Sequence, residues 1–367
     1  MLPVQDHPTQ FPCPHCGADV TWDPAAGVQR CKNCGTTIAP PAATTAIREL
    51  DYAKWAAGAG ADDDLREQLV VHCGRCGAQT TFGPNVTAGH CAFCGAAMSA
   101  EGESKKLIKP QALLPFRVPR TQSLELFQQW IRKRWFAPNA LKRVARADAQ
   151  RLRGVYLPFW TYDADTTTEY TGQRGDDYTT TETYTANENG RPVTRTRTVV
   201  HTRWSGASGQ VRNQFDDVLV AAGGAMPRPI VDKLEPWDLE RLVPFAEAYL
   251  AGFESESYRV DLVSGLGIAK DMMQPTIDST IRADIGGDHQ RIDEKSTDYR
   301  DITFKHLLLP MWVCSYRFRD KVYRFVVNAR TGEVQGERPW SVLKIAFAVL
   351  LACAVAGGIW YLSANRG

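Results

Sequence analysis

Ten cysteines occur in this chain of 367 residues, and eight of them form four C-x-x-C pairs within the first hundred residues. Each pair is followed directly by glycine, and the pairs group into two modules of identical spacing, C-x2-C-x14-C-x2-C. Two facing C-x-x-C turns supply the tetrahedral set of four thiolates that Zn²⁺ accepts. The sequence therefore predicts two metal sites. The predicted ligands are Cys13, Cys16, Cys31 and Cys34 in the first site, and Cys73, Cys76, Cys91 and Cys94 in the second.

Four thiolates leave no coordination position for water or substrate, so we expect two structural zinc ions. Iron in a rubredoxin-like site has the same ligands and is the alternative, which a red colour would reveal. Disulfides are disfavoured, because paired thiols without a secretory signal at the start of the chain indicate a reducing compartment. Although His15, His72 and His90 lie beside the cysteines, we do not expect them to be ligands.

The two cysteine modules form a tandem repeat with an offset of sixty residues, which also aligns Trp22 with Phe82. We expect two zinc ribbons of common fold, residues 11–38 and 71–98, joined by a linker with one short helix, residues 39–70. Modules of this size bury too little apolar surface to fold alone. Metal binding would therefore supply their folding free energy.

Residues 111–338 predict one α+β domain with an antiparallel sheet. Strands are expected where an apolar-Pro-aromatic sequence occurs, as in YLPFWTYDA at 156–164 and LLLPMWVCSYRF at 307–318. Proline at the start of a strand removes no ladder hydrogen bond. The threonine-rich segment 161–204 has two alternating stretches around the turn NENG, which predicts a hairpin with two polar faces that projects from the body.

Residues 345–362, IAFAVLLACAVAGGIWYL, contain no charge and are long enough to cross about 30 Å of hydrocarbon as a helix. Lys344 precedes this run and Trp360 lies near its end, which is typical of a membrane span with interfacial side chains. We predict a single transmembrane helix, residues 342–362. It would tail-anchor the chain in the inner membrane and leave the amino-terminal bulk in the cytoplasm. A buried core helix is the alternative.

The cysteine modules resemble the zinc ribbons of transcription factors and replication proteins, and this resemblance implies metal and fold but no partner. From the paired modules through YLPFWTYDAD and DIGGDHQRI to the apolar end, the chain is similar to a family of uncharacterised bacterial zinc-ribbon membrane proteins. Members are sometimes labelled primosomal protein N-prime or replication factor Y helicase. The sequence has no G-x-x-x-x-G-K-[ST] phosphate loop, so we do not expect an ATP-driven helicase.

The basic segment 131–154 is the best candidate for a nucleic-acid contact. Its candidate residues are Arg132, Lys133, Arg134, Lys142, Arg143 and Arg146. A solvated helix face or a surface that meets anionic lipid is the favoured alternative. The first hundred residues carry six basic and nine acidic side chains, and each Zn(Cys)4 site would add further negative charge, which phosphate repels.

Asp288 and His289 lie together after a double glycine and could serve as acid and base. They belong to no recognisable catalytic motif, so we predict neither catalytic residues nor a small-molecule substrate. The favoured function is a non-enzymatic adaptor that recruits a protein partner at the membrane through its zinc ribbons and hairpin. A membrane-associated nucleic-acid-binding protein without a helicase motor is the alternative, and a hydrolase using Asp288 and His289 is the third hypothesis.

Overall fold

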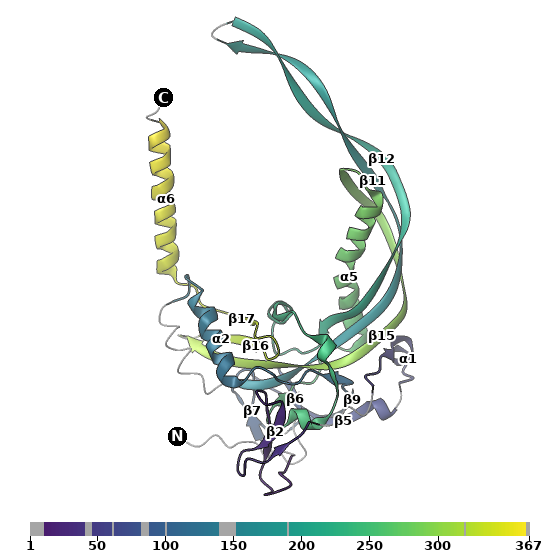
Figure 1. The fold of residues 1–367 in the computed structure, drawn as a ribbon, viewed down its shortest axis with the longest axis vertical. Coiled ribbons are helices and arrows are strands. Elements are labelled where there is room, and N and C mark those ends of the chain that lie inside the picture. Colours follow the sequence, from purple (N-terminus) through teal and green to yellow (C-terminus); the bar gives the residue numbers. More distant parts are fainter. Residues whose placement is uncertain are drawn as a thin grey trace.

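Three long strands form the centre of the molecule. The computed structural model describes residues 11–40, 46–60, 62–81, 88–99, 101–138, 152–188, 191–318 and 321–364. Strands β11 (Arg153–Glu188), β12 (Arg191–Ala221) and β15 (His289–Phe318) lie in the order β12-β11-β15, with antiparallel pairing throughout. Figure 1 shows them as a twisted arc that rises from the body of the molecule.

Short strands complete this sheet around the base of the arc. β15 continues into β16 (Lys321–Asn328), and β16 pairs with β17 (Val334–Gly336). The remaining members are β4 (Leu50–Asp51), β10 (Ala112–Leu113), β13 (Val243–Pro244) and β14 (Glu254–Ser255). The body is sheet-rich as expected, but its sheet is mixed, because β10 runs parallel to β15 and β14 runs parallel to β11.

Helix α5 (Leu262–Ile285) covers the concave face of the arc (Figure 1). The Asp261 carboxylate accepts a hydrogen bond from the Ser264 amide at 2.8 Å and so begins the helix. Gly286, with a φ of +67°, ends it. Buried apolar side chains recur every three or four residues along the face that packs on the sheet. They are Leu262, Leu266, Ala269, Met273, Ile277, Ile281 and Ile285.

Helix α2 (Arg120–Arg132) packs on the other part of the sheet, where Phe127 stacks on Phe325 with ring centroids 3.4 Å apart. The residues that follow α2 contact the start of α6 (Val342–Ala364). The shorter helical turns are α4 (Arg228–Val231), η1 (Asp62–Asp64), η3 (Asp232–Leu234), η4 (Leu239–Arg241) and η5 (Glu247–Leu250). These turns connect strands and contribute one buried side chain each at most.

The threonine-rich hairpin is the distal part of β11 and β12. Its pairing runs without interruption from Ala164↔Phe215 to Glu188↔Arg191. β15 accompanies β11 only as far as Gly175↔His289. Residues 176–203 therefore form a two-stranded segment, which we call the distal ribbon, and no described side chain within it is buried. The paired strands extend on both sides of the predicted range 161–204.

The segment predicted as a linker contributes more than a connection. Helix α1 (Tyr52–Ala56) is short, and β4 before it pairs with β15. β5 (Leu65–His72) begins within the predicted linker and pairs with β9 (Glu103–Ile108), which lies beyond the predicted end of the second ribbon. The second zinc module is therefore larger than residues 71–98, because its sheet takes a strand from each side.

Helix α6 (Val342–Ala364) stands apart from the sheet (Figure 1). Its segment Val342–Tyr361 spans 20 residues with a mean hydropathy of 2.4, and none of the residues in its most apolar stretch is buried against the body. A helix of this length reaches about 30 Å, the thickness of a bilayer core. The helix is thus long and apolar enough to span a membrane. It is not the buried core helix considered as the alternative.

Candidate metal centres

The structure brings the eight predicted ligands together in two groups of four. Within each group the sulfur atoms all lie within 4.8 Å of one another. Sulfur–sulfur distances within the groups include 3.7 Å for Cys13–Cys34, 3.5 Å for Cys16–Cys31, 3.5 Å for Cys73–Cys94 and 3.5 Å for Cys76–Cys91. A tetrahedron with Zn–S bonds of about 2.3 Å requires sulfurs about 3.8 Å apart. Each group can therefore hold one zinc ion with little adjustment.

Four turns of the same geometry hold these sulfurs. In each turn the glycine after the second cysteine donates its amide to the carbonyl of the first cysteine, at 2.8–3.1 Å. Those glycines have φ values between +69° and +74°, a conformation that other residues rarely adopt. They are Gly17, Gly35, Gly77 and Gly95. The glycine after each pair is therefore required by the turn that presents the sulfurs.

The surroundings of two thiols favour the thiolate form that binds metal. Hydrogen bonding from Thr36, whose hydroxyl lies 3.0 Å from the Cys34 sulfur, lowers the pKa of Cys34 to about 6. Hydrogen bonding between Cys76 and Cys91 lowers the pKa of Cys76 to about 5 and raises the pKa of Cys91. Hydrogen bonding with Cys34 raises the pKa of Cys16, and burial raises the pKa of Cys94 to about 11, so these shifts favour the thiolate at only part of each group.

The first ribbon contains β1 (Val20–Asp23), β2 (Val28–Cys31) and β3 (Thr37–Ile38) and is fixed to the body through Trp22. The Trp22 indole donates to the Phe116 carbonyl at 3.0 Å, and its ring lies 4.9 Å from that of Tyr249. The Gln29 amide donates to the Ala248 carbonyl at 2.8 Å. The ribbon is thus docked rather than freely tethered, while its own core consists of only a few residues around Val20.

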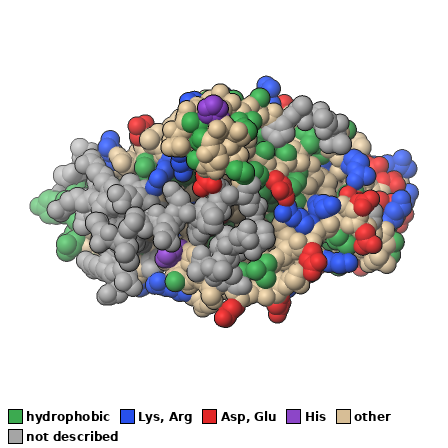
Figure 2. Space-filling view, turned by 90° about the horizontal axis from the view of Figure 1, so that it is seen from below, with side chains coloured by type: hydrophobic (Ala, Val, Ile, Leu, Met, Phe, Trp, Pro, Cys, Tyr) green, Lys and Arg blue, Asp and Glu red, His purple; other side chains and the backbone are tan. Residues whose placement is uncertain are grey.

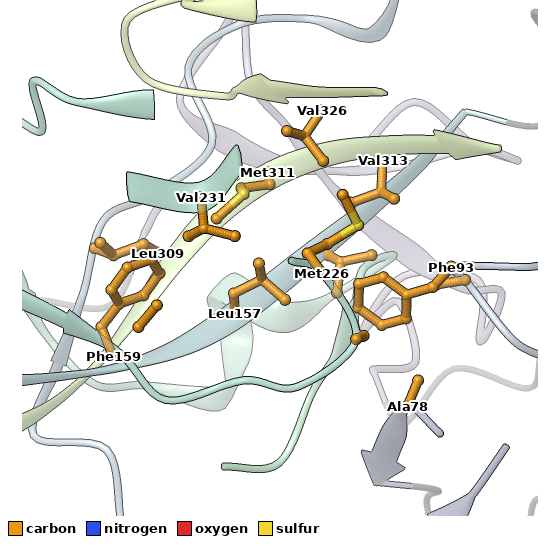
Figure 3. Packing of buried hydrophobic residues seen from close by; sticks show 14 of the residues in the cluster. Ala78, Phe93, Leu157, Phe159, Met226, Val231, Leu309, Met311, Val313 and Val326 are labelled. Atoms are coloured by element: carbon orange, nitrogen blue, oxygen red, sulfur yellow. The ribbon is translucent and has the colours of Figure 1, made fainter. Parts of the chain in front are cut away.

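The second ribbon is part of the main core. It contains a three-stranded sheet, in which β6 (Gln79–Thr81) pairs with β5 beside β9, and a separate two-stranded sheet of β7 (Ala88–His90) and β8 (Ala97–Ser99). Cys73, Cys91 and Phe93 belong to the same buried cluster as Leu157 and Met226 of the body. Figure 3 shows Phe93 beside Met226 in this cluster. The second metal centre is therefore continuous with the packing of the central sheet.

The histidines beside the cysteines are exposed and belong to neither group of four. A third cluster, which the sequence did not suggest, contains Asp163, Asp216 and Asp217. The buried ammonium of Lys305 lies 2.8 Å from Asp217 Oδ1 and 2.9 Å from Glu49 Oε1. A lysine thus already supplies the cation at this cluster. Glu49 comes from the segment between the ribbons and secures it to β15.

Asp288 and His289 lie where β15 begins, on the surface. The His289 Nε2 atom is 3.1 Å from Asp177 Oδ2, and Asp288 accepts a hydrogen bond from the Asp177 amide at 2.7 Å. Hydrogen bonds from Thr202 and His289 lower the pKa of Asp177. The polar sequences around residues 172–177 and 285–292 are thus brought together, and their contacts join the start of β15 to the hairpin.

The basic segment is described only in part. Arg132 and Lys133 are exposed at the end of α2, and the guanidinium of Arg134 lies 4.9 Å from the Trp130 ring. The other candidate residues, Lys142, Arg143 and Arg146, lie outside the described residues. The described part of this segment is next to the base of α6, which the sequence did not indicate.

A cavity of about 900 Å³ lies between the two ribbons and the body. It is lined by His306, whose Nδ1 is 2.8 Å from the Ile108 carbonyl and whose pKa burial lowers to about 4. Glu254 also lines it, and burial raises the pKa of that carboxyl to about 7. Five acidic and five basic residues line the cavity, so its charge selects neither an anion nor a cation.

Comparison with known proteins gives one informative similarity. The chain is 26% identical over 345 residues to the uncharacterized protein YdjG of Bacillus subtilis (strain 168), and the match covers 92% of each chain. No family model matches the sequence. No solved structure matches it either. The similarity covers nearly the whole chain. The name of that relative states no activity, so it does not support the helicase label.

Proposed function

We propose that the protein is a non-enzymatic adaptor, held at the cytoplasmic membrane by α6 and built around two structural zinc ions, that recruits a protein partner. The observation that carries the proposal is the distal ribbon, residues 176–203. It extends beyond the three-stranded part of the sheet, and none of its described side chains is buried. Such a segment adds nothing to the core, so its length is explained best by a contact outside the molecule.

The distal ribbon offers main-chain groups for strand addition. β12 is an edge strand of the sheet, and beyond Gly175 the second edge of β11 is also without a partner strand in the described part of the chain. Unpaired strand edges bind extended segments of other chains through main-chain hydrogen bonds. Residues 176–203 carry four acidic and four basic side chains. This balance favours a protein partner over a polyphosphate one.

The zinc ribbons support this role as rigid parts of the body. Both candidate sites are closed by four thiolates, which favours structural ions. Figure 2 views the molecule from the ribbon end, and acidic and basic side chains are interspersed on the described part of that face. That mixture supports contact with protein and does not favour a nucleic-acid surface.

Shortening the distal ribbon tests the proposal. Replacing residues 179–200 with Asn-Gly would join the pair Tyr178↔His201 through a two-residue turn and preserve the register of the remaining strands. We expect the variant to stay in the membrane fraction with two zinc ions per chain. The partner protein that copurifies with the full-length chain from membranes should be absent from the preparation of this variant.

Site-specific photo-crosslinking provides the matched control. Val200 in the distal ribbon is 61% exposed and Val263 on α5 is 58% exposed, so a photoreactive residue at either position is similarly accessible. We expect a discrete crosslinked protein from position 200 and none from position 263. Equal crosslinking at both positions, or unchanged partner recovery with the shortened ribbon, would contradict the adaptor role of this segment.

A further inference from the structure

We propose that the surface around the base of α6 binds the headgroups of anionic phospholipids. We call this surface the collar and define it as residues 132–137 together with residues 338–344. The inference rests on the proposed membrane anchoring by α6 and deepens it, because it names the lipid class and the residues that meet it. It does not depend on the adaptor role of the distal ribbon.

Hydrogen bonds join the two parts of the collar. The Ser341 amide donates to the Phe136 carbonyl at 2.8 Å. The Lys344 ammonium donates to the carbonyls of Trp135 at 2.8 Å and Ala137 at 2.9 Å. The end of α2 is thus fixed beside the first turn of α6, as Figure 1 shows. Where α6 enters a bilayer, the collar must lie at the level of the headgroups.

Two exposed tryptophans mark this level. Trp135 is 54% exposed and Trp340 is 58% exposed. Both are linked to Phe136, with ring centroids 4.9 Å and 6.2 Å away. Exposure of a large aromatic ring to water is unfavourable, whereas tryptophan is favoured at the boundary between hydrocarbon and headgroups. Their position directly before an exposed apolar helix fits that boundary.

The charge of the collar selects the lipid. Its two segments contain five basic residues and no acidic one. The basic residues are Arg132, Lys133, Arg134, Arg338 and Lys344. The guanidinium of Arg338 lies 4.3 Å from the centre of the Trp340 ring, so a cation and an interfacial aromatic ring are in direct contact. Basic residues next to a membrane helix attract anionic headgroups. Each such side chain at the surface increases the affinity for an anionic membrane by a factor of roughly five.

The position of the collar also argues against nucleic acid as its ligand. A duplex bound there would have to lie against the exposed apolar side chains of α6, such as Leu343 at 84% exposure and Phe347 at 60%. Apolar side chains add no favourable contact to the phosphates of a duplex. A lipid bilayer, in contrast, covers the apolar helix with its acyl chains and the basic collar with its headgroups.

Reconstitution of the full chain tests this inference. The protein is inserted into nanodiscs of phosphatidylcholine alone, or of phosphatidylcholine with phosphatidylglycerol, and amide hydrogen exchange is followed in residues 131–138. We expect exchange at least about fivefold slower with phosphatidylglycerol. The difference should disappear at high salt and in the double variant Arg132→Glu, Lys133→Glu. The matched control Lys106→Glu, Lys233→Glu reverses two exposed charges elsewhere and should keep the difference.

Two further measurements separate the possible failures. Carbonate extraction of the Arg132→Glu, Lys133→Glu variant should leave it in the membrane, because α6 provides the anchor; release of wild-type chain would refute the anchoring itself. Equal protection in both nanodiscs, with the chain still anchored, would overturn the collar proposal alone. Binding of a labelled DNA duplex that is lost in this variant would also overturn it, by assigning the same residues to nucleic acid.

Discussion

Replacing Cys91 with serine should lower the melting temperature of the whole body, whereas replacing Cys31 should unfold little more than the first ribbon. The two cysteines hold equivalent positions in the repeat. Cys91 packs in the buried cluster that includes Leu157 and Met226, while Cys31 belongs to a small cluster of its own ribbon. Bound zinc supplies about 10 kcal/mol or more of folding free energy to modules of this size.

Metal analysis and thermal unfolding together measure this difference. Wild-type chain should contain two zinc ions, and each variant should contain one. The variant Cys353→Ser, which changes an exposed cysteine of α6, should retain both ions. If the two ribbon variants melted at the same temperature, the second metal centre would not be coupled to the main core. Visible absorption by the purified protein would indicate iron in place of zinc.

The variant Lys305→Met should lose about 3–5 kcal/mol of unfolding free energy at neutral pH. The Lys305 side chain is 7% exposed and lies among Glu49, Asp163 and Asp217. Burial by itself lowers the pKa of Lys305. The carboxylates outweigh this effect and raise the pKa above its usual value, so the lysine stays charged. Without it, Asp163 and Asp217 would be left close together without their cation. Denaturant unfolding in a neutral buffer would measure the loss.

The loss in the Lys305→Met variant should depend on pH. Burial already raises the pKa of Asp163 in the native protein, and removal of the lysine would raise it further. A carboxyl with a raised folded-state pKa contributes stability below its unfolded value of about 4 and loses it as pH rises through the folded value. The deficit should therefore be smallest near pH 4 and grow toward neutral pH.

The ion pair of Arg300 with Asp298 provides the control for this network. These side chains are 63% and 62% exposed, so water screens their attraction. We expect Arg300→Met to leave the denaturation midpoint unchanged at every pH. If Lys305→Met also left the denaturation midpoint unchanged, the prediction would be wrong. The carboxylates around residue 305 would then be hydrated in the variant without loss of unfolding free energy.

The parts of this molecule that could be predicted from its sequence depend on local spacing. The C-x-x-C-G turns are determined by five consecutive residues, so the metal ligands follow from the pattern alone. The uncharged run at 345–362 and the alternating threonines of the hairpin are equally local. Their physical cause lies within the segment itself, whether it is a turn conformation, a helix length or a strand period.

The contacts that could not be predicted join residues far apart in the sequence. Trp22 binds the carbonyl of Phe116, and Glu49 reaches Lys305. A tryptophan in a zinc ribbon indicates burial but does not identify the surface that buries it. In the same way, the basic residues after Ile131 reveal charge, whereas only the fold places them beside Lys344. The parallel pairing of β10 with β15 likewise depends on the complete topology.

The direction of the hairpin limits how the molecule can sit in a flat bilayer. In Figure 1, α6 and the far end of β11 and β12 extend toward the same end of the molecule. If lipid surrounds α6, the part of the paired strands level with this helix is at the depth of the acyl chains, where exposed strand edges cannot satisfy their amides and carbonyls, and the polar tip extends past the carboxyl-terminal end of α6. Three hydrogen bonds at Ser341 and Lys344 oppose a swing of the helix. A protein that covers these strand edges at the depth of α6 would itself have to reside in the bilayer, whereas one that binds the tip would meet it beyond the far end of the helix.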